Sequence, residues 1–255
     1  MARIEGGLSG MSTHKPLVIL KTGRKIPSLD AVAGDYEDWI AAGMGWEPDV
    51  VRVIDPGNGE ALPPLDSVAG IAITGSGSMV TERADWMLRT AEWLADAVRR
   101  EVPVLGICFG HQLLAYALGG EVDYNPRGVE VGTVEVTLAD AAADDPLFSV
   151  LPKRLWAQLS HRQSVRALPP GATLLGASEM EPHQGFAFGP CAWGVQFHPE
   201  FDERIIARFV RYYREILAEE GRSTEDLLTA IRPAPESQAL LKRFGEWVLK
   251  ARGHP

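Results

Sequence analysis

The segment best suited to chemistry is an apolar run that meets a predicted helix at a cysteine, Val104-Leu-Gly-Ile-Cys108-Phe-Gly110-His-Gln112. Glycines stand two residues before and two residues after Cys108, so the chain can turn sharply and point the sulfur outward. The N-terminus of a helix offers unpaired N–H groups and a partial positive charge, and both favour a thiolate. The backbone N–H of Phe109 would then face an oxygen on the carbon under attack. A cysteine that only packs is the alternative, but packing does not require a glycine on each side.

A thiol nucleophile needs a base, and the base needs a group that orients it. The run that ends in Phe-His198-Pro-Glu200 predicts a strand that stops at His198, because Pro199 cannot continue a central strand. Glu200 follows two residues later, so its carboxylate could fix the tautomer of His198 and stabilise its imidazolium form. Taken alone, His-Pro-Glu indicates an ordinary loop. Together with the cysteine turn it predicts a catalytic set of Cys108, His198 and Glu200.

These residues need a scaffold, and the first half of the chain predicts an α/β one. Short apolar runs predict strands at residues 16–21, 50–54, 70–74 and 102–107, and helical periodicity predicts helices at residues 36–42, 83–100 and 109–118. Strands that alternate with helices favour a three-layer, mostly parallel open sheet with helices on both faces.

The pattern changes after Gly120. Residues 128–138 alternate apolar and polar side chains, which is typical of an antiparallel, half-buried strand. Further elements are expected as strands near residues 154–159, 173–178, 184–188 and 192–197, and as a helix at about 202–218. After the break at Pro233-Ala-Pro235, five apolar residues predict a final amphipathic helix: Leu240, Leu241, Phe244, Trp247 and Val248.

We therefore expect a flexible tail at residues 1–14, a catalytic domain at 15–220, and a helical extension at 221–255 that packs on the same domain. A partner-docking face on the extension is the alternative. Met11 could be a second start, which leaves open whether residues 1–10 are native.

Composition narrows the class of protein. The 255 residues carry a net charge of −9 without a basic stripe, which argues against nucleic-acid binding. No apolar run reaches the roughly 18 residues of a membrane span, and no secretory signal is evident, so we expect a cytoplasmic protein. The two cysteines cannot build a disulfide framework and lack the spacing of a zinc site. Cys191 is expected to pack within its strand.

The cysteine segment followed by His198-Pro-Glu200 resembles the class I (triad) glutamine amidotransferases. The resemblance covers nearly the whole chain and is closest to free-standing chains similar to the amidotransferase domain of GMP synthase. It implies the flavodoxin-like fold of that family, with added antiparallel strands. It also implies a γ-glutamyl thioester on Cys108, with no metal or organic cofactor.

The resemblance implies roles for further residues. Gln112 matches a glutamine that contacts substrate, with an ordinary polar helix residue as the alternative. His161 falls in a Ser-His segment that contacts substrate in relatives, with a solvated loop as the alternative. Gly75 and Ser76 stand where the family has a Gly-Gly-Pro loop that supplies a second oxyanion N–H. The loops at residues 22–35 and 121–130 are where we expect substrate selectivity.

Three functions fit the sequence. The first is a glutaminase-type subunit that passes ammonia from glutamine to a synthetase partner. The chain has no P-loop of its own, and the stretch after Glu200 is too short for a synthetase domain. The second is a stand-alone hydrolase of γ-glutamyl peptides. The third is a non-catalytic regulatory protein on the same fold, against which the intact set of Cys108, His198 and Glu200 argues.

Overall fold

The computed structural model describes residues 15–47 and 50–252, and the expected tail at residues 1–14 lies outside this part. Its main sheet contains nine strands, in the spatial order β2-β1-β3-β4-β11-β10-β9-β6-β7. Their bounds are β1 (Leu17–Leu20), β2 (Val51–Ile54), β3 (Gly70–Ile73), β4 (Val104–Ile107), β6 (Glu130–Leu138), β7 (Arg154–His161), β9 (Thr173–Ala177), β10 (Gly185–Phe188) and β11 (Ala192–Val195).

The sheet changes character at β11. The neighbours β2, β1, β3, β4 and β11 pair in parallel, whereas β11, β10, β9, β6 and β7 pair antiparallel. A separate antiparallel pair is formed by β5 (Glu121–Tyr124) and β8 (Gln163–Ala167). Because β11 pairs in parallel with β4, the carboxyl ends of both strands lie at the same edge of the sheet.

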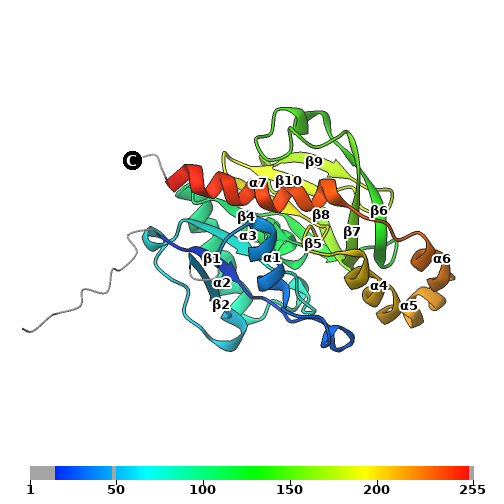
Figure 1. Ribbon diagram of the computed structural model, residues 1–255. Coiled ribbons are helices and arrows are strands. Elements are labelled where there is room, and N and C mark those ends of the chain that lie inside the picture. Colours follow the sequence, from blue (N-terminus) through cyan, green and yellow to red (C-terminus); the bar gives the residue numbers. More distant parts are fainter. Residues whose placement is uncertain (1–14, 48–49, 253–255) are drawn as a thin grey trace, which may run out of the picture.

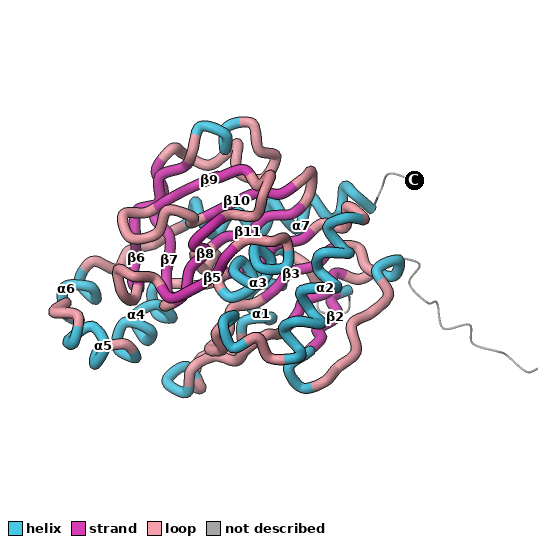
Figure 2. Tube along the Cα trace, turned by 180° about the vertical axis from the view of Figure 1, so that it is seen from behind, coloured by secondary structure: helices cyan, strands magenta, loops and turns pink. Residues whose placement is uncertain are grey.

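Helices cover both faces of the parallel strands (Figures 1 and 2). They are α1 (Tyr36–Met44), α2 (Asp85–Arg99), α3 (Phe109–Ala117), α4 (Glu203–Tyr212), α5 (Arg214–Glu219), α6 (Thr224–Thr229) and α7 (Pro235–Arg252). Helices α1 and α7 lie on one face, and α2 and α3 lie on the other. Helices α4 to α6 stand at the end of the molecule next to β6 and β7, as Figure 1 shows.

Strand β1 shows why this layering suits the sequence. Its four side chains are all buried, as expected for a central parallel strand covered on both faces. Leu17 and Ile19 join the core under α1 and α7, whereas Val18 and Leu20 join the core under α2 and α3. The period of two along the strand therefore feeds two apolar layers, and a continuous apolar run results.

The expected three-layer α/β fold with added antiparallel strands is confirmed, but three details differ. The short elements β5, β8 and α6 were not expected, because β5 is mostly exposed and α6 buries no side chain, which leaves little apolar periodicity. The helix expected at 202–218 is interrupted at Tyr213, where α4 ends and α5 begins. The apolar stripe continues through this break, so the periodicity of the sequence does not reveal that the helix is interrupted.

The last helix, α7, packs along α1 and β7. Leu240, Phe244 and Val248 are fully buried in the same core as Ile40 of α1 and Trp193 of β11. The Phe244 ring meets that of Trp193 edge-on at 6.3 Å between centroids. Residues late in the chain therefore complete the core under the parallel strands. No helix of the described chain is long and apolar enough to cross a membrane.

This packing predicts that Phe244→Ala lowers the free energy of unfolding by about 3–5 kcal/mol, because it removes a buried ring and leaves a cavity. Leu249→Ala is the matched control on the same helix, since Leu249 is half exposed. It should change stability by less than about 0.5 kcal/mol. Urea unfolding measures both. Equal effects would mean that α7 is not part of the cooperative core.

Candidate active site

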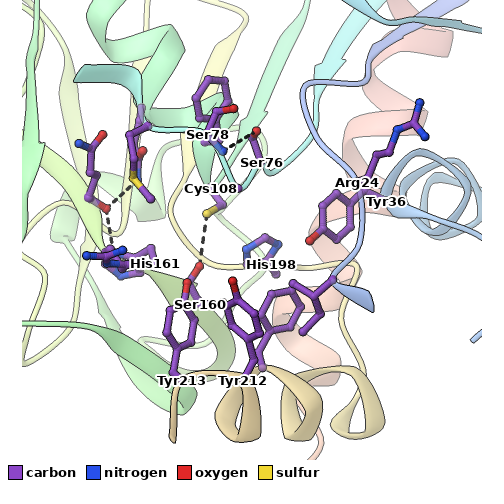
Figure 3. Close-up of a pocket in the computed structure, with 18 of the residues that line it drawn as sticks. Arg24, Tyr36, Ser76, Ser78, Cys108, Ser160, His161, His198, Tyr212 and Tyr213 are labelled. Atoms are coloured by element: carbon purple, nitrogen blue, oxygen red, sulfur yellow. Dashed lines mark hydrogen bonds between the residues drawn. The ribbon is translucent and has the colours of Figure 1, made fainter. Parts of the chain in front are cut away.

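A cavity of about 380 Å³ opens at the carboxyl ends of the parallel strands (Figure 3). Open α/β sheets usually bind ligands at this edge. Its wall is built from seven segments: the loop after β1, the start of α1, the loop after β3, the start of α3, the β7–β8 turn, the loop after β11, and the α4–α5 junction. Cys108 and His198 both line it, so the cysteine and histidine motifs meet in one place.

Cys108 occupies the turn between β4 and α3 in a backbone conformation that side chains rarely adopt, with φ 51° and ψ −102°. Its N–H donates to the Val195 carbonyl at 2.8 Å, and its carbonyl accepts from the Gln112 N–H at 3.1 Å. These bonds hold the turn against a strain of about 1–3 kcal/mol. Backbone strain at a reactive residue of a strand-to-helix turn is the geometry of a nucleophile elbow.

The flanking glycines serve close packing, not backbone freedom, since neither has a positive φ. A Cβ on Gly106 would lie 2.4 Å from the carbonyl oxygen of Gly110. A Cβ on Gly110 would lie 2.5 Å from the carbonyl oxygen of Ile73. Backbone atoms cannot give way to such contacts, so only glycine lets α3 start this close to β3 and β4. The sequence pattern located the turn correctly, and the structure supplies a different reason for it.

His198 is held firmly beside Cys108. Its Nδ1 lies 2.7 Å from Oε1 of Glu200, and both side chains are buried. The Phe201 ring stacks on the imidazole at 3.9 Å with an interplanar angle of 7°. Because Nδ1 donates to the Glu200 carboxylate, Nε2 is the nitrogen left to act on the sulfur.

The charges around His198 favour its protonated form. Burial lowers the pKa of His198, but the charge of Glu200 and that of a Cys108 thiolate, with hydrogen bonds to both, raise it to about 10. His198 is therefore an imidazolium at neutral pH. The sulfur also lies 3.7 Å from the Ser160 carbonyl oxygen, so it sits between this carbonyl and the imidazole.

Donors for an oxyanion stand on both sides of the sulfur. Phe109 is the first residue of α3, and Ser76 follows Gly75 in the loop after β3. Neither the Phe109 nor the Ser76 backbone N–H is hydrogen-bonded to the described chain. A Cβ on Gly75 would lie 2.9 Å from Cε1 of His198, so a side chain there would push the imidazole away. The Ser76 hydroxyl is engaged elsewhere, because it donates to the Thr22 carbonyl at 2.7 Å.

Gln112 and His161 both line the cavity, but their polar atoms are largely committed. The Gln112 amide nitrogen donates to the Gln163 carbonyl at 2.6 Å and to the Gln196 side chain at 3.0 Å. His161 contacts the Gln163 carbonyl through Nδ1 at 2.9 Å and Glu130 through Nε2 at 2.8 Å. Both ring nitrogens of His161 therefore have partners within the protein, and its contact with substrate stays a prediction.

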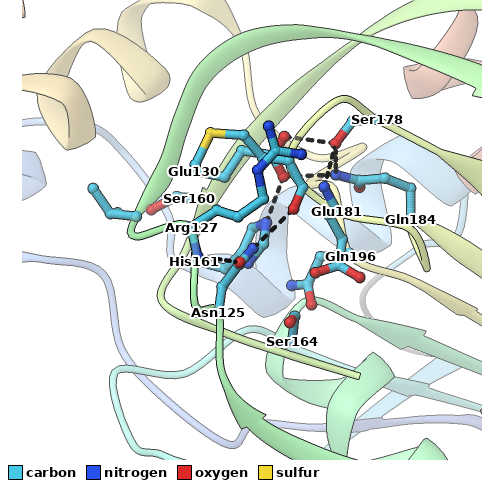
Figure 4. A network of polar contacts seen from close by, with 12 residues as sticks. Asn125, Arg127, Glu130, Ser160, His161, Ser164, Ser178, Glu181, Gln184 and Gln196 are labelled. Atoms are coloured by element: carbon cyan, nitrogen blue, oxygen red, sulfur yellow. Dashed lines mark hydrogen bonds and ion pairs between the residues drawn. The ribbon is translucent and has the colours of Figure 1, made fainter. Parts of the chain in front are cut away.

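A buried polar network surrounds His161, as Figure 4 shows. Besides His161, Glu130 accepts from the Ser178 hydroxyl at 2.6 Å and from the Gln184 amide at 2.8 Å. Burial lowers the pKa of His161, but the hydrogen bond and charge of Glu130 outweigh it and raise the pKa above its ordinary value. The alternating pattern had placed Glu130 on the polar face of its strand, whereas the structure buries it.

Several other residues at the site were not expected from sequence. Tyr213 lies at the α4–α5 junction, where burial raises its pKa to about 12, and Tyr36 begins α1. Both phenols therefore stay protonated and can donate. Arg24 reaches the cavity from the loop at 22–35, where selectivity was expected, but no residue of 121–130 lines it. In the sequence, Tyr36 and Tyr213 look only like members of the apolar stripe of a helix, so nothing there predicts that they line the cavity.

Comparisons with known proteins identify the family of this chain. The family described as glutamine amidotransferase class-I matches residues 43–208. Gamma-glutamyl peptidase 5 of Arabidopsis thaliana is 33% identical over 168 residues, which cover 65% of this chain and 66% of the peptidase. The GMP synthase (glutamine-hydrolyzing) of Aeropyrum pernix is 36% identical over 159 residues, which cover 62% of this chain and 28% of the synthase.

A solved glutamine amidotransferase from Thermotoga maritima superposes with a TM-score of 0.72 at 26% identity, and the alignment covers 93% of this chain and 99% of that one. The chain therefore belongs to the glutamine amidotransferase class-I family. The matched segment spans about two thirds of the peptidase and under a third of the synthase.

The two cysteines should react differently with iodoacetamide near neutral pH. Burial and the charge of Glu101 raise the pKa of Cys191 to about 11, so its thiol stays protonated, whereas Cys108 faces the cavity beside His198. Peptide mass spectrometry of the folded protein should find the label on Cys108 and little on Cys191. Unfolded protein, which should label at both positions, is the control. Equal labelling in the folded state would contradict the environment described for either thiol.

Proposed function

We propose that this protein hydrolyses the amide of a γ-glutamyl group through a thioester on Cys108, with His198 as general base and acid and Glu200 as its orienting carboxylate. The observation that carries the proposal is the position of His198, fixed by Glu200 at 2.7 Å and facing the sulfur of a strained elbow. These are the parts that nucleophilic catalysis by a thiol requires. A non-catalytic protein would have no use for them.

In the first half-reaction, the Cys108 thiolate attacks the γ-carbonyl carbon. A carbon–sulfur bond forms, and the carbonyl oxygen becomes an oxyanion that the N–H groups of Phe109 and Ser76 stabilise. When the tetrahedral intermediate collapses, the carbon–nitrogen bond breaks. His198 gives its proton to the leaving nitrogen, and ammonia or an amine departs. The γ-glutamyl thioester remains on Cys108.

In the second half-reaction, water replaces the leaving group. His198, now neutral, takes a proton from the water as the oxygen attacks the thioester carbon. The carbon–sulfur bond breaks, Cys108 leaves as the thiolate, and free glutamate is released. His198 ends with the proton that it took from water and remains paired with the Glu200 carboxylate, which restores the starting ion pair. Every proton is therefore accounted for by the residues present.

Two substrate classes fit this chemistry. Glutamine would yield ammonia, and GMP synthases among the relatives suggest a synthetase partner that accepts it. A γ-glutamyl peptide would yield an amino acid or peptide, and two gamma-glutamyl peptidases of Arabidopsis thaliana, 33% and 32% identical, favour this second candidate. We place either reaction in the cytoplasm, where reducing conditions keep a thiol such as Cys108 free.

The direct test is release of glutamate from glutamine and from a panel of γ-glutamyl peptides. Cys108→Ala should lower kcat/KM by at least about a thousandfold on every substrate, because no thioester can form. Cys191→Ala is the matched control, since it removes a buried thiol outside the cavity. It should keep wild-type kinetics. Activity retained by Cys108→Ala would refute the assignment, and activity on glutamine only with an added synthetase would select the ammonia-transfer function.

The pH profile should report the charge of Glu200. With the His198 pKa near 10, kcat/KM should fall only as pH rises towards that value, because the acid that protonates the leaving nitrogen is then lost. Glu200→Gln removes a negative charge that raises the pKa, so the alkaline limb should move to lower pH by about one unit or more. Glu203→Gln, an acidic residue at the start of α4 outside the cavity lining, is the control. An alkaline limb unmoved in Glu200→Gln would show that Glu200 does not set the protonation of His198.

A further inference from the structure

The cavity extends on two sides of the reactive sulfur. Figure 3 shows Ser160 and His198 next to the Cys108 sulfur, with Tyr36 and Arg24 beyond His198 and further from Ser160. Arg162 follows His161 in the β7–β8 turn and also lines the cavity. Two cations from separate segments, Arg24 and Arg162, therefore line the cavity.

The position of the proton donor determines where the glutamyl half and the leaving half of a substrate lie in the cavity. The inference rests on the proposed function, in which His198 protonates the leaving nitrogen. That nitrogen must therefore lie on the His198 side of the scissile carbon, and whatever is attached to it extends towards Tyr36 and Arg24. The glutamyl half is left to the side of Ser160 and Arg162. Free glutamine has only a hydrogen-bearing nitrogen on the leaving side, so it would not reach Arg24.

Arg24 is available for a ligand and is carried by a braced loop. Among the described residues, no carboxylate pairs with its guanidinium. The loop that bears it is closed by Asp35, which accepts from the Lys25 N–H at 2.8 Å and from Lys21 Nζ at 3.0 Å. Leu29 of the same loop is fully buried with residues of α4. The loop is thus tied at its ends and at its middle, while Arg24 itself remains exposed.

The wall of the same cavity also offers apolar surface. Besides Arg24, the cavity is lined by Ile26 from the loop and by Tyr212 and Ile216 from the α4–α5 junction. Tyr212 is 58% exposed, so its ring is accessible to a ligand that enters the cavity. A cation beside apolar side chains suits a group that carries both a carboxylate and an apolar side chain.

We propose that Arg24 forms a leaving-group subsite that binds the C-terminal carboxylate of a γ-glutamyl amino acid, with Ile26, Tyr212 and Ile216 accommodating its apolar side chain. Arg162 binds the α-carboxylate of the glutamyl half. The preferred substrate is then a γ-glutamyl amide with a carboxylate on each half. This assignment makes the loop at 22–35 the element that distinguishes such a compound from free glutamine.

The test compares γ-glutamyl-leucine with γ-glutamyl-leucinamide, which differ only in the carboxylate assigned to Arg24. Wild-type protein should cleave the acid with a kcat/KM about fivefold above that of the amide, the upper end of the gain expected for an Arg–carboxylate pair at an exposed site. In Arg24→Gln, this ratio should fall below about twofold. In Arg162→Gln, kcat/KM should fall for both compounds by the same factor, and the ratio should persist.

The matched control is Arg52→Gln, an exposed arginine of β2 outside the cavity, which should keep the wild-type ratio. Equal cleavage of acid and amide by wild type, or an Arg24→Gln variant that lowers both equally, would overturn the subsite and leave the proposed hydrolysis standing. A wild-type protein that cleaves neither compound nor glutamine would instead overturn the proposed function itself. The ratio within each variant also removes any difference in folded fraction.

Discussion

The strained backbone at Cys108 is the constraint around which the site is arranged. A non-glycine residue at φ 51° persists only where its neighbours over-determine the turn. Here the N–H of Cys108 is bonded to β11, its carbonyl closes the first turn of α3, and two glycines let the helix start against β3 and β4. This backbone conformation makes the Cys108 sulfur face the cavity, next to the unpaired N–H groups at the start of a helix. The close packing of α3 against β3 and β4 therefore holds Cys108 in position at the cavity.

The mixed sheet follows from the need to place His198 beside this cysteine. His198 lies just beyond β11, and β11 runs parallel to β4 in a register that pairs Val195 with Ile107, the residue before Cys108. The two motifs, far apart in sequence, therefore leave the sheet at the same edge. Because β10 and β9 pair antiparallel on the other side of β11, the chain can form this strand without another crossover helix. The antiparallel half of the sheet thus allows β11 to bring His198 beside Cys108.

The features that could be predicted from the sequence are those whose signal lies within a few neighbouring residues. The features that were missed depend on contacts with distant segments of the chain. A cysteine between glycines at a strand end, or a histidine two residues before a glutamate, signals its chemistry within a few positions, and so do short apolar runs for the sheet. Glu130 gives no such signal, because it becomes buried only when Ser178 and Gln184 from later segments surround it. Tyr213 looks like one more member of an apolar stripe, and the break between α4 and α5 that turns it to the cavity leaves the periodicity unchanged. Arg24 is indistinguishable from a solvated loop residue until the loop is folded over the site.

The buried pair of His161 and Glu130 shows how far the support of the site extends below its surface. The Gln163 carbonyl can only accept, and Glu130 already receives hydrogen bonds from Ser178 and Gln184, which suits an ionised carboxylate. Both nitrogens of His161 must then donate, so the ring is an imidazolium. A buried ion pair contributes little net stability, but removing one partner leaves the other as an uncompensated charge. The pair joins the start of β6 to the end of β7, and Ser160, whose carbonyl faces the Cys108 sulfur, is the residue next to His161. Despite its cost in desolvation, the pair therefore fixes the part of the cavity wall that carries Ser160.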